Sequence, residues 1–199
     1  ALDKEAYKRS TSVYLVGRVL PMLPEKLSNV LCSLRPKEDK LAYSVVFTFD
    51  KNRKLKHRWI GRTVIHSDHR FSYEEAQEML EGKPGPVKKE INLVNSIAEE
   101  LRKERFRTGS INFSTDEVRF ELDDKGKPIS ASVKQQKDSN KLIEEFMLLA
   151  NKAVALFIKE KEVAPQVPFI YRVHDLPDED KLQDLAIIAG ELGFKIDTN

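Results

Sequence analysis

The chain has 199 residues, of which 40% are hydrophobic and 33% are charged, a balance that excludes wholesale disorder and allows a buried core. A formal net charge of +2 excludes nucleic-acid binding through the overall electrostatic field, so such binding requires local clusters of Lys and Arg. The single cysteine, Cys32, excludes an internal disulfide and a thiolate metal site, and it predicts a reducing, cytoplasmic location. Polar residues interrupt the longest apolar run, 146–158, which predicts a buried helix rather than a membrane span.

The first half of the chain predicts helices around one long hairpin. After a helical pattern at the N-terminus, Pro24 and Pro36 bound a second helix whose apolar face has i, i+3, i+4, i+7 spacing: Leu27, Val30, Leu31 and Leu34. The runs 41–49 and 56–65 are rich in β-branched and aromatic residues and predict an antiparallel hairpin. Ser72 and Glu75 then have the spacing of a capping box, for a short helix that ends at Gly82.

The second half begins after a break at 83–86. A long charged helix follows it, with Val87, Ile91, Val94, Ala98 and Leu101 on one face. The segments 118–122 and 129–133 predict a second hairpin, and 168–173 predicts a buried strand. Asp138 or Ser139 is placed to cap a helix with an apolar stripe, and a last helix runs from Pro177 to Gly193. This mixture predicts an α+β fold, with a mainly antiparallel sheet and packed helices.

Few residues have the spacing of a catalytic or metal site. His66, Asp68 and His69 form a local cluster, for which a polar junction between strand and loop is the favoured interpretation and a distinct metal enzyme an alternative. The two glycine-rich phosphate-binding motifs, G-x-G-x-x-G and G-x-x-x-x-G-K-[ST], are absent. Cys32 lies inside a predicted helix and is interpreted as a structural thiol.

Two further patterns favour a binding cleft. Glu144 borders the apolar stripe of its helix and can reach into a cleft, although a solvated helix face also explains it, whereas Glu145 is predicted to point away from the stripe. Aromatic and cationic residues alternate in three places, 7–14, 69–73 and 105–113, a combination typical of single-stranded nucleic-acid binding but also found in ordinary helices and cores.

Six motifs in a fixed order extend over almost the whole chain: LDKEAYKRSTSVYL, VLPMLPEKLSNVLCSL, HSDHRFSY, GSINF, NKLIEEFMLLAN and YRVHD. Together they resemble the central part of the catalytic (RNB) domain of the ribonuclease II / ribonuclease R family. The residues of the motifs resemble most closely those of the bacterial ribonuclease R branch. The resemblance implies processive 3′→5′ hydrolysis of single-stranded RNA to nucleoside monophosphates. It also implies Mg²⁺ as the cofactor of the full-length enzyme.

The resemblance assigns roles to individual residues. Tyr14 matches an aromatic residue that stacks on the RNA near its 3′ end, and Phe113 matches the opposing aromatic. Tyr73 matches a tyrosine that lines the nucleotide cavity. Glu144 matches a cavity glutamate close to the terminal nucleotide and is the candidate catalytic residue.

Two features of the family pattern do not occur between residues 1 and 199: the aspartate cluster that binds metal and the downstream arginine motif. We therefore expect residues 1–199 to form a single, truncated domain that supplies walls of an RNA channel. We expect this chain by itself to be inactive and to bind no metal tightly, and the protein to be a monomer without a membrane partner. The alternative is a non-catalytic RNA-binding module that retains the fold.

Overall fold

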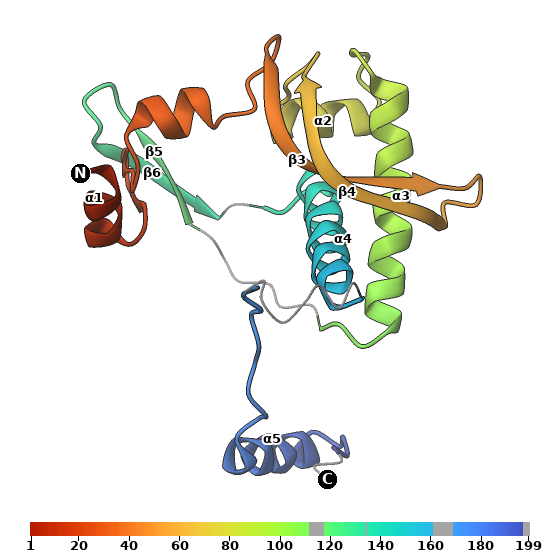
Figure 1. The fold of residues 1–199 in the computed structure, drawn as a ribbon. Coiled ribbons are helices and arrows are strands. Elements are labelled where there is room, and N and C mark those ends of the chain that lie inside the picture. Colours follow the sequence, from red (N-terminus) through yellow and green to blue (C-terminus); the bar gives the residue numbers. More distant parts are fainter. Residues whose placement is uncertain (112–117, 134, 161–168, 197–199) are drawn as a thin grey trace. The chain divides into compact units, whose positions relative to one another are not determined.

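The computed structural model describes residues 1–111, 118–133, 135–160 and 169–196. Contacts divide the chain into two units, Ala1–Leu156 and Phe157–Asn199, and each is described by itself. The elements are shown in Figure 1 and are, in chain order, α1 (Leu2–Arg9), β1 (Val13–Leu15), β2 (Arg18–Leu20), η1 (Lys26–Leu31), β3 (Asp39–Phe49), β4 (Leu55–His66), α2 (Tyr73–Leu80), α3 (Lys88–Arg107), β5 (Val118–Leu122), β6 (Pro128–Val133), α4 (Asp138–Glu160) and α5 (Glu179–Glu191).

The strands of the described residues form three separate antiparallel hairpins, β1–β2, β3–β4 and β5–β6. The predicted α+β class and the two predicted hairpins are confirmed. β1–β2 is an additional, shorter hairpin of three residues in each strand. No strand of the described residues joins two hairpins into a larger sheet, so the expected sheet is present only as two-stranded pieces.

The long hairpin β3–β4 is fixed by its turn and packs on α4. The Asp50 carboxylate accepts hydrogen bonds from the backbone N–H groups of Asn52 and Lys54, both at 2.9 Å, and this closes the turn. The Phe49 ring at the end of β3 lies edge-on to the ring of Phe146 in α4, with centroids 6.4 Å apart. The hairpin therefore reaches the helix that carries Glu144.

The predicted capping box begins α2. Ser72 Oγ accepts from the backbone N–H of Glu75 at 3.1 Å, and Glu75 Oε2 accepts from the backbone N–H of Ser72 at 2.7 Å. Gly82, at φ 115°, follows the helix as predicted. This local sequence signal therefore places Tyr73 in the first turn of α2.

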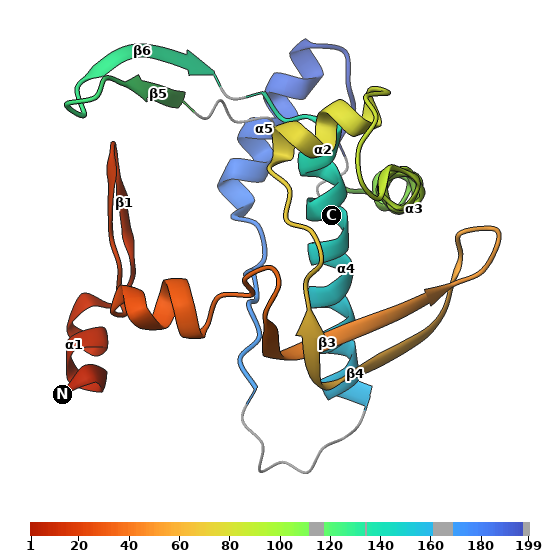
Figure 2. The same cartoon turned by 90° about the horizontal axis from the view of Figure 1, so that it is seen from above.

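Helices α3 and α4 lie side by side in both views (Figures 1 and 2), and small residues are buried on both. Ala98 of α3 and Ala153 of α4 are among the few fully buried apolar residues, and Glu145 of α4 is buried as well. Arg105 of α3 reaches across to Glu145. A largely buried ion pair therefore joins the two helices.

The helix predicted between Pro24 and Pro36 is wrong in length, and the predicted burial of its apolar face is wrong as well. Only Lys26–Leu31 is helical, and its last turn closes with a hydrogen bond from the Cys32 N–H to the Leu27 carbonyl at 2.8 Å, as in a π-helix. Val30, Leu31 and Leu34 are exposed. Periodicity predicts a continuous apolar face, but the described residues offer no element on which this face is buried.

The strand predicted at 168–173 is also wrong over its described part. Residues 169–173 form no strand, and Ile170 and Val173 are highly exposed. A strand needs a neighbour for its backbone N–H and C=O groups, and no described strand pairs with this segment. The final helix, α5, is close to its prediction, since Asp178 rather than Pro177 is its N-cap and Gly193, at φ 85°, follows its end.

None of the helices within the described residues is both long and apolar enough to span a lipid bilayer.

Candidate nucleic-acid interface

Tyr14 lies in the middle of β1, opposite Val19 of β2, and 80% of its surface is exposed. Gly17, at φ 81°, makes the tight turn between the strands, and a Cβ at this position would lie 2.9 Å from Leu122 Cδ1 in β5. The Ser12 hydroxyl accepts a hydrogen bond from the Met22 N–H at 2.9 Å and ties the start of the hairpin to the segment after it. The hairpin thus presents an aromatic ring to solvent, as a base-stacking role requires.

Tyr73 lines a cavity of about 260 Å³. The cavity is formed by the first turn of α2, by β5 and β6, and by the start of α4, and its walls include two cationic side chains, Arg119 and Lys137. Glu74 also lines it and lies 3.8 Å from Arg119. Tyr73 is 48% exposed, so its ring is accessible from this hollow. An aromatic ring beside cations suits a nucleotide.

A hydrogen bond between α2 and α4 brings the Tyr73 and Glu144 segments together. The backbone N–H of Ser139 donates to Gln77 Oε1 at 3.0 Å, and both residues are buried. Tyr73 lies one helical turn before Gln77, and Glu144 lies five residues after Ser139. Ser139 is in the first turn of α4, where backbone N–H groups have no acceptor within the helix. Its N–H is therefore satisfied by a side chain of α2 and not by a local cap.

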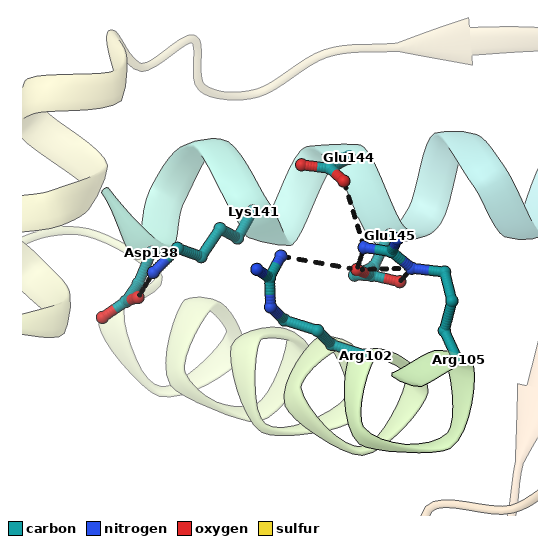
Figure 3. Close-up of polar contacts among 6 residues, drawn as sticks. All are labelled: Arg102, Arg105, Asp138, Lys141, Glu144 and Glu145. Carbon is teal, nitrogen blue, oxygen red and sulfur yellow. Dashed lines mark hydrogen bonds and ion pairs between the residues drawn. The ribbon is translucent and has the colours of Figure 1, made fainter. Parts of the chain in front are cut away.

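Figure 3 shows Arg105 reaching from α3 toward two adjacent carboxylates of α4. Its Nε lies 3.2 Å from both oxygens of Glu145, and its Nη2 lies 2.5 Å from Glu145 Oε1 and 3.1 Å from Glu144 Oε1. Arg102 Nη1 is 3.8 Å from Glu145 Oε1. One buried carboxylate therefore faces two guanidinium groups.

The predicted orientation of Glu145 is wrong. Its side chain is 3% exposed, whereas that of Glu144 is 38% exposed. Glu145 lies three residues after Leu142 and four before Leu149, so it lies on the same helix face as these leucines and faces α3. Glu144 does lie at the edge of the buried face, which leaves it partly open to a ligand.

Hydrogen bonding to Glu145 is the main cause that raises the pKa of Arg105 above its ordinary value, and burial acts in the opposite direction. The guanidinium is therefore permanently charged. The Cζ atoms of Arg102 and Arg105 each lie 5.0 Å from the Phe106 ring centroid. Arg105 belongs to the aromatic–cationic pattern at 105–113, which is typical of nucleic-acid binding, but its guanidinium is engaged by contacts within the protein.

The three residues of the possible metal cluster point to different partners. His66 Nδ1 lies 2.7 Å from Asp39 Oδ1, Asp68 lies 3.9 Å from Lys37 Nζ, and His69 stacks on Phe71. Over the ranges that the structure describes, no group of three His, Cys, Asp or Glu side chains is arranged to hold a metal ion. Glu144 is paired with an arginine, which does not suit a ligand of Mg²⁺. These residues do not fit a resident magnesium site.

Of the residues that the resemblance assigns, Tyr14, Tyr73 and Glu144 are accessible, and Phe113 lies outside the described residues. Sequence reasoning missed the link between Arg105 and the two glutamates. A signal was present, because Glu145 interrupts the spacing between Leu142 and Leu149 with a charge. An acid on an otherwise apolar helix face indicates a buried partner.

The folded elements and the aromatic and acidic residues that they present define an RNB-type domain segment, and comparison with known proteins agrees. The family model for the RNB domain matches residues 1–198, so the chain belongs to the RNB domain family. The chain is 40% identical over 200 residues to ribonuclease R of Aquifex aeolicus, covering 98% of this chain and 28% of the relative. It is 38% identical over 215 residues to DIS3-like exonuclease 2 of Schizosaccharomyces pombe, covering 100% of this chain and 23% of the relative.

A solved structure shows the same similarity. Mycoplasma genitalium RNase R in complex with ribose-methylated single-stranded RNA matches with a TM-score of 0.86 and 31% identity. The match covers 100% of this chain and 31% of the other. The chain thus spans under a third of the relatives that it matches.

Proposed function

We propose that the protein carrying this chain is a processive 3′→5′ exoribonuclease that hydrolyses single-stranded RNA to nucleoside monophosphates, and that residues 1–199 supply walls of its RNA channel. The observation that carries the proposal is the Tyr73 cavity, in which an accessible aromatic ring lies beside Arg119 and Lys137 in a chain of the RNB family. Rings can stack on any base, and cations attract any phosphate, so such a site binds RNA with little sequence preference.

The residue roles are those that the resemblance implies, and the accessibility of Tyr14, Tyr73 and Glu144 supports them. The exposed Tyr14 ring stacks on a base near the 3′ end, opposite Phe113, and each stacked base contributes roughly 1–3 kcal/mol. Tyr73 lines the cavity for the terminal nucleotide. Glu144 has one oxygen paired with Arg105, and its other oxygen can accept a hydrogen bond from a hydroxyl of that nucleotide.

We also propose Mg²⁺ as the cofactor, held by carboxylates outside residues 1–199. When bound, divalent metal in such enzymes activates water and stabilises the leaving oxygen. The carboxylates of this chain contribute binding and orientation, so the chain alone is inactive. The parent protein is proposed to be a cytoplasmic monomer.

The test is an RNA degradation assay with the full-length protein on single-stranded RNA labelled at the 5′ end, with Mg²⁺ or with EDTA. A processive 3′→5′ enzyme yields short labelled end products without an accumulated ladder, and EDTA abolishes them. RNA that is bound but stays intact with Mg²⁺ would overturn the proposal and favour the non-catalytic RNA-binding module.

A further inference from the structure

The Arg105 guanidinium is the one group of the described residues that contacts both acidic side chains at 144–145. Nε and Nη2 bind the two oxygens of Glu145, with three nitrogen–oxygen distances of 2.5–3.2 Å. A guanidinium is planar, and its N–H groups point in fixed directions. The contact with Glu145 therefore sets the plane of the whole group.

Burial makes this anchor strong. The Glu145 side chain is 3% exposed and that of Arg105 is 26% exposed, so water competes little for either group. Each would be costly to bury without the other. Arg102 Nη1, at 3.8 Å from Glu145 Oε1, adds a second positive charge near the same carboxylate oxygen. Both guanidinium groups thus hold Glu145 against α3.

The fixed guanidinium in turn determines where Glu144 can lie. Nη2 carries two hydrogen atoms, so it can donate to Glu145 and, at 3.1 Å, to Glu144 Oε1 at the same time. Among the described residues, the hydrogen bond of the Glu144 carboxylate is made by Oε1, and none is made by the second oxygen, Oε2. Figure 3 shows Glu144 on the far side of the guanidinium from α3. One oxygen of Glu144 is thus held and the other is open.

We propose that Arg105 is a positioning residue for Glu144, and that Glu145 is the buried anchor that fixes Arg105. This proposal rests on the proposed function, in which Glu144 faces the terminal nucleotide. A half-exposed glutamate without such a partner samples several rotamers, and each must be restricted when RNA binds. The ion pair between α3 and α4 restricts them before the substrate arrives.

The experiment is a mutant cycle in the full-length enzyme, measured by single-turnover and steady-state hydrolysis of a short RNA. Replacing the buried pair together, by Arg105→Met with Glu145→Leu, removes the positioning group without leaving a lone buried charge. We expect this double variant to lower kcat about tenfold, the size expected for a misplaced reacting group, with KM changed by less than about twofold. Combined with Glu144→Gln, the same pair of changes should cause no further loss, because the residue that it positions is already impaired.

Two single substitutions complete the design. Arg105→Lys keeps a positive charge near Glu145 but lacks the planar fork, so we expect a folded enzyme with a similarly reduced kcat. Lys103→Met is the matched control, because Lys103 lies on the same helix and, among the described residues, pairs with Glu100 of that helix. Its kcat should equal that of the parent enzyme.

The outcomes separate the two proposals. If the losses from the pair and from Glu144→Gln multiply, or if Arg105→Lys retains full kcat, Arg105 does not act through Glu144 and the positioning role is wrong while the exoribonuclease remains. If the parent enzyme itself leaves RNA intact with Mg²⁺, the proposed function fails, and the positioning role fails with it.

Discussion

The α3–α4 helix pair and the β1–β2 hairpin carry different kinds of site residue. In α3–α4, Glu144 is held by Arg105, which is itself anchored by a carboxylate that is 3% exposed. In β1–β2, every residue of both strands is exposed, and the Tyr14 ring makes no ring contact among the described residues. Substitutions in the helix pair should therefore change stability together with activity, whereas a change at Tyr14 should affect RNA binding alone.

The largest expected effect tests the helix pair. Arg105→Met by itself leaves Glu145 buried with only the more distant Arg102, and breaking a buried pair in this way costs roughly 3–5 kcal/mol of unfolding free energy. The measurement is denaturant unfolding of the full-length protein followed by a signal from this domain. Arg107→Met, which breaks an exposed pair with Glu104, should leave the unfolding free energy almost unchanged. Equal stability of the two variants would show that the α3–α4 pair is not an anchor.

The next effect tests the hairpin. Tyr14→Ala should weaken binding of short single-stranded RNA by roughly 1–3 kcal/mol, the contribution of one stacked base, with unchanged unfolding. Fluorescence anisotropy with a labelled RNA measures the affinity. Phe113→Ala should have a similar effect if the two rings face each other. Normal affinity in both variants would refute the stacking clamp.

A smaller effect is expected where α2 places Tyr73. Ser72→Ala removes the hydroxyl that accepts from the Glu75 N–H, and loss of such a cap costs about 1 kcal/mol. The unfolding temperature should fall slightly. The RNA affinity should fall slightly as well, because the first turn of α2 lines the nucleotide cavity. Ser72→Asp, which can still cap the helix, should retain most of both. A Ser72→Ala variant as stable as the parent would show that the cap is dispensable.

The same cap predicts a pH dependence. The backbone N–H of Ser72 is the main cause that lowers the pKa of Glu75 below its ordinary value of 4.5. Because the folded-state pKa is the lower one, the ionised carboxylate stabilises α2 above the unfolded pKa, and this contribution is lost as the pH falls through the folded pKa. The stability difference between parent and Glu75→Gln should therefore shrink on acidification. A difference that stays constant from about pH 6 to about pH 3 would contradict the linkage.

The smallest effect is expected at Cys32. The thiol is exposed at the end of η1, so Cys32→Ser should change the unfolding free energy by less than about 0.5 kcal/mol. The rate of RNA hydrolysis should stay the same. The control is Leu27→Ser, which removes a partly buried side chain of the same short helix. A large loss in Cys32→Ser would assign the thiol a role that its exposure does not indicate.

Local features were predictable because their causes are close in sequence. The β-branched and aromatic residues of 41–49 and 56–65 predict β3–β4, and Ser72 with Glu75 predicts the start of α2. The wrong predictions concern segments whose structure depends on a neighbouring element. Residues 169–173 have the composition of a strand but no described strand to pair with, and the apolar face of 27–34 has nothing in the described residues to cover it.

The sequence by itself determined two of the three hairpins of the described residues, the capping box of α2 and the family resemblance. Through that resemblance it also named the candidate RNA-binding residues Tyr14, Tyr73 and Phe113 and the candidate catalytic residue Glu144. Only the tertiary structure decided which of two adjacent glutamates is buried. It is Glu145, which the helical pattern predicted to point away from the apolar stripe. The reason is that helical spacing fixes the direction of a side chain but not what lies there. Arg105 comes from 40 residues earlier in the chain, and only the packing of α3 on α4 brings it to Glu144 and Glu145.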